Sequence, residues 1–252
     1  MRQLVVCGLI LLATMAYPQT ISQSVAKGQH VATNDIQANG LFVTDPTFLD
    51  PAPDGLFSSG ASGKVVEVGR SVAPDGSALL VVLRNNTDGP VRQVAISARV
   101  RDGDKVVALG TSASLLPFEI APSGLGLMVV PFDHGKLKSD LIADAEVRVE
   151  TSADSSFYGY ETVDVIDVIV EADKTFVGFA SRSGGGMSTT AEDVTVVCLN
   201  AADTRQPIRT WASFSLTEDI ELDSSASAVI ERTIEGCGDD IMAAALGTDG
   251  KY

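Results

Sequence analysis

The chain resembles itself at an offset of one hundred residues. Val94 and Ile96 correspond to Val194 and Val196. The other matching pairs are Val65 and Val165, Val68 and Val168, Leu116 and Leu216, Ile120 and Ile220, Val129 and Val229, Val130 and Ile230, and 140–143 and 240–243. Most are apolar residues in short alternating runs, the pattern of strands that turn one face toward a core. The offset therefore predicts two copies of one packing scheme, and no catalytic side chain repeats with it.

The first sixteen residues have the form of a secretory signal. Arg2 precedes an apolar run over 4–13, and small residues end at Ala16, where we expect cleavage. The run is shorter than the roughly 20 apolar residues that a membrane-spanning helix needs. We therefore expect a signal peptide over 1–16 and a secreted or periplasmic mature protein with no integral membrane segment.

Residues 17–62 are rich in Pro, Gly, Ser and Asp, which predicts an extended arm with little secondary structure of its own. The arm carries Gly-Leu-Phe twice, at 40–42 and 55–57. Apolar anchors of this kind can add to a strand edge of their own molecule or of a neighbour. We favour docking on the same molecule, because the effective concentration is higher there.

Residues 63–152 and 160–250 each contain short strands separated by turns. In the first repeat Val94–Arg101 alternates apolar and polar residues, and a glycine turn at 101–105 leads into a partner strand. Antiparallel strands at this spacing must cover each other as two sheets. We predict an all-β protein of two tandem immunoglobulin-like antiparallel β-sandwiches behind the arm, meeting at a modest joint near 152–161. Only one-turn helices are expected, near 136–141 and 239–244.

One stretch of the first repeat resembles a known family. It comprises Asn85-Asn86-Thr87, the alternating strand Val94–Asp102, Gly103, Val106-Val107 and the turn Ala121-Pro122-Ser123-Gly124. It is similar to the FxLYD and CARDB families of bacterial extracytoplasmic immunoglobulin-like domains. Where the FxLYD motif has Phe, Leu, Tyr and Asp, this chain has Ala98, Val100, Arg101 and Asp102. The resemblance implies a fold and a role in adhesion or assembly, and no catalytic residue.

Two cysteines, Cys198 and Cys237, remain after the signal is removed, and both lie in the second repeat. An even number in an oxidising compartment favours one disulfide, with two free buried thiols as the alternative. The spacing is not that of a catalytic CxxC pair.

The formal net charge of −15 argues against a nucleic-acid partner, because no basic patch is present to displace phosphate counterions. It disfavours anionic membrane surfaces as well. Acidic clusters around Asp102 and over 218–223 lack the spacing of an EF-hand loop, so weak calcium binding stays an open alternative.

Catalytic signatures are sparse. The chain has only two histidines, His30 and His134, which excludes a multi-histidine zinc site, and it has no G-x-S-x-G motif. The Gly184–Gly186 run is not followed by a predicted helix and is expected to form a hairpin turn. We expect no cofactor and no enzyme activity, although a pair of distant carboxylates or a site at His134 would make a cryptic hydrolase. Trp211 is expected in the core, and Asn85 forms an N-glycosylation sequon expected in an exposed turn.

These observations predict a non-enzymatic structural or protein-interaction protein, with a protein partner or self-assembly. The alternative is a module that binds a glycan or another small ligand at the seam between the repeats. Aromatic residues concentrate there at Phe157, Tyr158 and Tyr160, which would contact the ligand.

Overall fold

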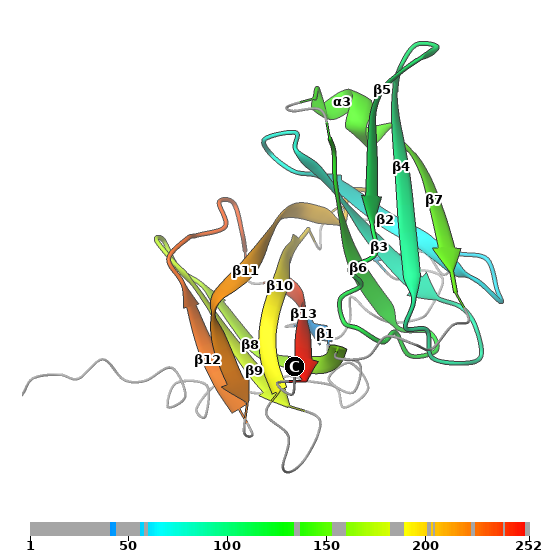
Figure 1. The fold of residues 1–252 in the computed structure, drawn as a ribbon. Coiled ribbons are helices and arrows are strands. Elements are labelled where there is room, and N and C mark those ends of the chain that lie inside the picture. The colour runs from blue at the N-terminus through cyan, green and yellow to red at the C-terminus, as the bar shows by residue number, and fades with distance from the viewer. Residues whose placement is uncertain are drawn as a thin grey trace, which may run out of the picture.

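The computed structural model describes residues 41–43, 56–57, 60–133, 137–152, 160–181, 189–200, 203, 205–222, 225–238 and 240–249. These residues form two β units that lie against each other (Figure 1). The first unit spans 60–152 and the second 160–249. The predicted all-β antiparallel class is confirmed.

The first unit consists of two three-stranded antiparallel sheets, ordered β2-β3-β6 and β5-β4-β7. Its elements are β2 (Val65–Val72), β3 (Ala78–Asn85), β4 (Val94–Asp102), β5 (Lys105–Ser112), β6 (Leu125–Pro131), α3 (Ser139–Ala143) and β7 (Glu146–Thr151). The glycine turn expected at 101–105 joins β4 to β5, with Gly103 at a φ of 59°.

The second unit repeats these pairings strand for strand. Its strands are β8 (Tyr160–Val170), β9 (Thr175–Ser181), β10 (Thr189–Leu199), β11 (Ile208–Leu222), β12 (Ser225–Ile230) and β13 (Ile241–Asp249). They pair as β8-β9-β12 and β11-β10-β13, and one additional pairing, β13 with β8, joins both groups into one sheet. The sequence repeat is therefore a repeat of strand connectivity.

The offset of one hundred holds best in β4 and β5. Ile96 pairs with Ser112 in the first unit, and Val196 pairs with Ala212 in the second. Elsewhere the offset drifts, since Val94 faces Thr151 whereas Val194 faces Ala245. The matching letters at 140–143 and 240–243 consequently differ in structure: the first set lies in α3, and the second enters β13. The expectation of a helix near 239–244 is thus wrong, because the apolar residues 241–244 pair with β10.

The sheets stack in four layers with three apolar cores between them. One core lies between β5-β4-β7 and β2-β3-β6, and another between β11-β10-β13 and β8-β9-β12. The third core lies between the two units. It joins Leu80, Val82 and Leu127 of the first unit to Val197, Trp211 and Met242 of the second, among sixteen buried residues. The expectation of a modest joint is therefore wrong, because the two units share an apolar layer.

The position of each strand in this stack explains its apolar pattern. All eight residues of β3 are buried, because its sheet is covered on both faces, and β10 and β13 are buried through 194–199 and 241–246 for the same reason. β4, in an outermost layer, alternates buried and exposed residues. Trp211 is buried as predicted, and it lies in the layer between the units.

The arm reaches both units of its own chain. β1 (Leu41–Val43), from the first Gly-Leu-Phe copy, pairs antiparallel with 242–244 of β13. Leu56 and Phe57, from the second copy, are buried in the layer between the units. Over these residues the arm docks on the same molecule, by strand addition at one anchor and by side-chain burial at the other.

The sequon residue Asn85 is not in an exposed position. Its side chain is fully buried, and its amide nitrogen donates to the carbonyls of Gly89 (2.8 Å) and Ile120 (2.9 Å). Its oxygen accepts from the amide and hydroxyl of Thr87. Asn85 therefore fixes the loop that follows β3, and the expectation of an exposed acceptor for glycosylation is wrong.

Candidate binding site at the seam and a free strand edge

A cavity of about 370 Å³ opens where the end of the first unit at which β4 begins and β7 ends meets the second unit. Its apolar lining includes Val94, Leu115, Phe118, Tyr160 and Leu246. Val94 begins β4, Tyr160 begins β8, and Leu246 belongs to β13, so the cavity exists only because the two units are docked. Its volume is within the range of small-ligand sites.

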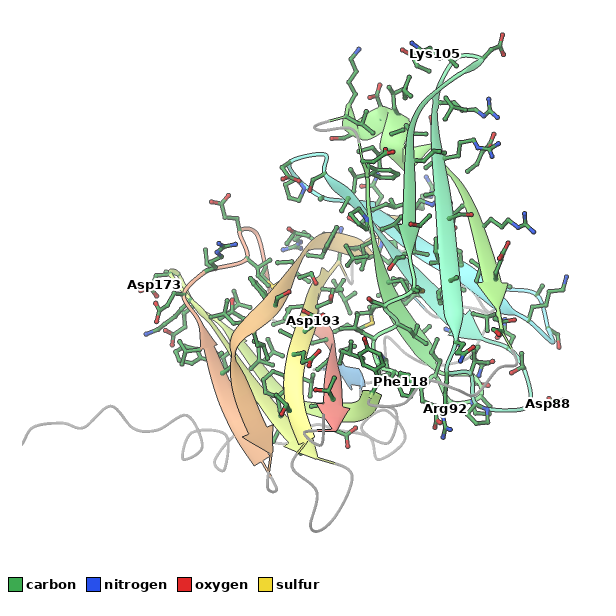
Figure 2. The ribbon with its side chains drawn as sticks, viewed as in Figure 1. Asp88, Arg92, Lys105, Phe118, Asp173 and Asp193 are labelled. Atoms are coloured by element: carbon green, nitrogen blue, oxygen red, sulfur yellow. A yellow bond between two sulfur atoms is a disulfide. The ribbon has the colours of Figure 1, made fainter. Side chains whose placement is uncertain are left out.

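The charges around this cavity are already paired. Arg92 Nε lies 2.5 Å from Glu119 Oε2, and Arg148 Nε lies 2.9 Å from Glu150 Oε1. Figure 2 shows Phe118 between the two units and Arg92 farther out on the first. A neutralised rim over an apolar floor suits an uncharged apolar or aromatic group better than an anion.

Of the three aromatic residues expected at the seam, Tyr160 lines this cavity. The rings of Tyr160 and Phe118 have centroids 5.9 Å apart with planes tilted by 32°. Phe157 and Tyr158 lie outside the described residues. Sequence reasoning missed Phe118, which lies 42 residues from Tyr160, because only the docking of the two units brings the rings together.

The edge of β7 runs up to this cavity. Glu150 and Thr151 line it, and within the part of the chain that the structure describes β7 pairs only with β4. The equivalent edge in the second unit is covered. Aligning Val94 with Val194 makes Arg148–Glu150 the counterparts of 242–244, which pair with β1, while 245–248 pair with β8. Among the described residues, the first unit thus has no counterpart of the strands that cover this edge in the second.

A buried cation lies at the second anchor of the arm. Arg84 is 2% exposed, and its Nη2 donates to the carbonyl oxygen of Phe57 at 3.3 Å. Its Nε has no partner among the described residues, and desolvation by burial lowers the pKa of its guanidinium. No carboxylate within the described ranges forms an ion pair with Arg84, so this residue holds the arm at the cost of an uncompensated charge.

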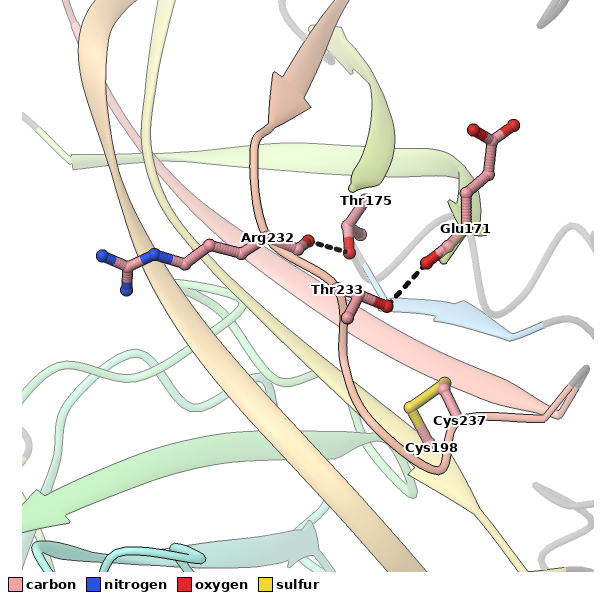
Figure 3. The surroundings of a disulfide bond; sticks show 6 residues. All are labelled: Glu171, Thr175, Cys198, Arg232, Thr233 and Cys237. Atoms are coloured by element: carbon pink, nitrogen blue, oxygen red, sulfur yellow. Dashed lines mark hydrogen bonds between the residues drawn. A yellow bond between two sulfur atoms is a disulfide. The ribbon is translucent and has the colours of Figure 1, made fainter. Parts of the chain in front are cut away.

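The predicted disulfide joins Cys198 of β10 to Cys237, which lies in the segment between β12 and β13. The Sγ atoms of Cys198 and Cys237 lie 1.97 Å apart, and their Cα atoms lie 5.1 Å apart. Two hydrogen bonds hold the same segment to the β8–β9 hairpin: Thr175 Oγ1 donates to Arg232 O (2.9 Å) and Thr233 Oγ1 donates to Glu171 O (2.6 Å) (Figure 3). Cys198 is fully buried, so the bond is structural.

The described ranges contain no cluster of residues suited to hold a metal ion. No group of three or more His, Cys, Asp or Glu residues is placed there to hold a metal ion. The acidic run 218–222 belongs to β11 instead of a loop, and Asp102 and Asp104 flank an exposed hairpin turn. His30, His134 and Gly184–Gly186 lie outside the described residues.

No helix in the described part of the chain is long and apolar enough to cross a membrane.

Comparisons with known proteins assign no family. No family model matches the sequence, and no curated protein matches it significantly. Among solved structures, one titled "Structure of allantoicase" aligns at 10% identity over 84% of this chain and 90% of its own. Its TM-score is 0.15, so the chain is similar to it only at a level that carries no argument about fold or activity.

Proposed function

We propose that this protein is a non-enzymatic structural or protein-interaction component of the secreted or periplasmic space, built from two tandem immunoglobulin-like sandwiches. The observation that carries the proposal is the strand chemistry of its edges. The arm of the chain closes one unit by strand addition, and the matching edge of the other unit stays unpaired in the described residues. An unpaired strand edge is a template for a further protein strand.

Four other features support this proposal. A disulfide and an acidic composition suit an oxidising compartment outside the cytoplasm. Trp211 is buried in the core between the units, where it contributes to packing. The resemblance to FxLYD and CARDB domains, carried by the strand and turn pattern of 80–132, agrees with a role in adhesion or assembly.

Cross-linking in the source cells tests this function. We expect the tagged protein in the extracytoplasmic fraction, without residues 1–16. It should be cross-linked either to a different protein or to a second copy of itself. A cytoplasmic protein that retains residues 1–16 would contradict the proposed compartment. A protein recovered only as an unlinked monomer would contradict the interaction role.

The cavity at the seam favours a second candidate, the binding of a small apolar or glycan ligand. Phe118 and Tyr160 supply ring faces, and the paired rim leaves no charge to select an ion. Titration of the mature protein with uncharged aromatic compounds and oligosaccharides, followed by calorimetry, tests it. Phe118→Ala should weaken binding and Leu109→Ala, at an exposed site on β5, should not. No saturable binding, or equal binding by both variants, would reject this candidate.

A further inference from the structure

We propose that β7 of the first unit pairs with β7 of a second copy of this chain, so that two β5-β4-β7 sheets join across a twofold axis. This inference rests on the proposed function, because it names the partner of the free edge. Figure 1 shows β7 at the side margin of the first unit, and of its residues only Glu150 and Thr151, at its C-terminal end, line the cavity at the seam. The backbone edge from Val147 to Val149 is therefore accessible without separating the two units.

The backbone groups available on this edge follow from the β4–β7 ladder. The Ser152 N–H donates to the Gln93 carbonyl at 3.2 Å, so residue 152 points its backbone groups toward β4. In an antiparallel ladder the direction alternates along the strand. The N–H and C=O groups of Val147, Val149 and Thr151 therefore point away from β4. Ala145 is unavailable, because Arg70 Nη1 donates to its carbonyl at 2.8 Å.

One register uses all of the available groups. In a symmetric antiparallel pair centred on Val149, that residue faces Val149 of the partner subunit, and Val147 faces Thr151 of the partner subunit. Each of these pairs exchanges two hydrogen bonds, since all three residues direct their backbone groups outward. Val147 and Val149 are half-buried in the single chain, and a neighbouring strand would cover them further.

The charges on the exposed face select the same register. Arg148, which pairs with Glu150 of its own chain in the monomer, would lie opposite Glu150 of the partner subunit, and the symmetry produces this attractive pair twice. A pair centred on Arg148 would place two arginines opposite each other, and a pair centred on Glu150 would place two glutamates together. Charged edge strands normally resist pairing. On this edge the alternation of sign makes one pairing self-complementary.

The distribution of charge over the chain also suits this arrangement. Residues 60–152 carry ten lysines and arginines against eleven aspartates and glutamates, whereas residues 160–249 carry five against seventeen. A contact through β7 joins the two nearly neutral units. The acidic second units, whose mutual repulsion would oppose association, stay outside the contact.

Sedimentation velocity of the mature chain over a concentration series tests the dimer. We expect a concentration-dependent monomer–dimer equilibrium, weakened roughly tenfold or more in Arg148→Glu and in Glu150→Arg, because two attractive cross-strand pairs become repulsive in each. An equimolar mixture of the two variants should dimerise again, because both cross-strand pairs of the mixed dimer again join opposite charges. Lys105→Glu, a charge reversal at the distant β4–β5 turn, should leave the equilibrium unchanged.

The mixture separates pairing from misfolding, since two misfolded variants would not restore each other. A wild-type chain that stays monomeric throughout the series, or a mixture that stays monomeric, would overturn the proposal. If Arg148→Glu keeps its cross-links in the source cells while the purified wild type is monomeric, the partner is another protein. The proposed function then survives and this inference fails.

Discussion

Phe57 shows how a single residue of the arm becomes part of the structure. The ring is 1% exposed and lies against β2 at Gly69, where an added Cβ would come within 2.9 Å of its Cε1 atom. The absence of a side chain at Gly69 therefore makes room for the ring. Phe57 is buried like a core residue, although it is separated from β2 by a segment rich in Ser and Gly.

We expect Phe57→Ala to lower the free energy of unfolding by about 3–5 kcal/mol, the usual cost of removing a fully buried aromatic ring. Guanidinium chloride denaturation measures this. Leu109→Ala, at a half-exposed site, is the control and should change stability by less than about 1 kcal/mol. A Phe57→Ala protein as stable as the control would show that the anchor contributes nothing.

For Arg84 we expect the opposite effect on stability, because replacing it should not destabilise the fold. Because burial lowers the pKa of its guanidinium, the charged form is penalised in the folded state at every pH below that pKa. Replacement by Met removes the penalty and loses one hydrogen bond to Phe57 O, worth about 1 kcal/mol. We expect Arg84→Met to keep or raise the thermal midpoint, equally at neutral and mildly acidic pH, since arginine stays protonated throughout.

Calorimetry of Arg84→Met beside Arg84→Lys tests this expectation. Lys keeps a buried charge with fewer donors, so that variant should be less stable than the Met variant. A Met variant clearly less stable than the Lys variant would mean that the charge of Arg84 is compensated.

At the scale of elements, the two units differ in how one flank of each is covered. In the second unit β13 is covered by β8 and by β1, whereas β7 of the first unit pairs with β4 alone among the described residues. The second unit also has the disulfide, which ties β10 to the segment entering β13. The flank that accepts the arm is thus the more strongly constrained one.

Removing the disulfide should weaken the second unit. For a sequence separation of 39 residues the loop-closure model gives a loss of roughly 4 kcal/mol in Cys198→Ala/Cys237→Ala. Hydrogen exchange should show the loss first in β10 and β13, because this bond ties β10 to the segment that enters β13. The reduced wild type is the matched control, and it should behave like the double variant. Unchanged protection in β10 and β13 would contradict a structural role.

At the scale of the molecule, four layers of sheet share three cores, and the middle core belongs to both units. Leu80, Val82 and Leu127 face the second unit and would meet water if the first unit stood alone. The two units should therefore unfold together, because separating them exposes a core and not a polar joint.

A fragment of residues 60–152 tests this coupling. We expect it to aggregate or to lack a cooperative thermal transition, while the whole chain shows one. Leu80→Thr/Val82→Thr in the fragment should improve its solubility, and the same pair in the whole chain should destabilise it. A wild-type fragment with its own sharp transition would show that the shared core is dispensable.

The sequence alone determined the β class, the repeat of strand connectivity and the cysteine pair. These properties depend on alternation along a strand, on turn residues and on residue counts, all of which are local. The apolar pattern of the sequence also reflects the stacking of the sheets, because continuous apolar runs such as 79–83 and 241–246 mark strands covered on both faces. A continuous apolar run by itself predicts a buried segment and does not say what covers it.

The tertiary structure alone decided how the two units meet and which strand edge is left unpaired among the described residues. Phe118 and Tyr160 come together only across the docked interface, and β1 chooses β13 through backbone hydrogen bonds that carry little sequence signature. The matched letters at 140–143 and 240–243 separated into a helix and a strand because their neighbours differ. Local pattern specifies what a segment can form, and the packing of distant segments selects which surfaces are buried and which remain for a partner.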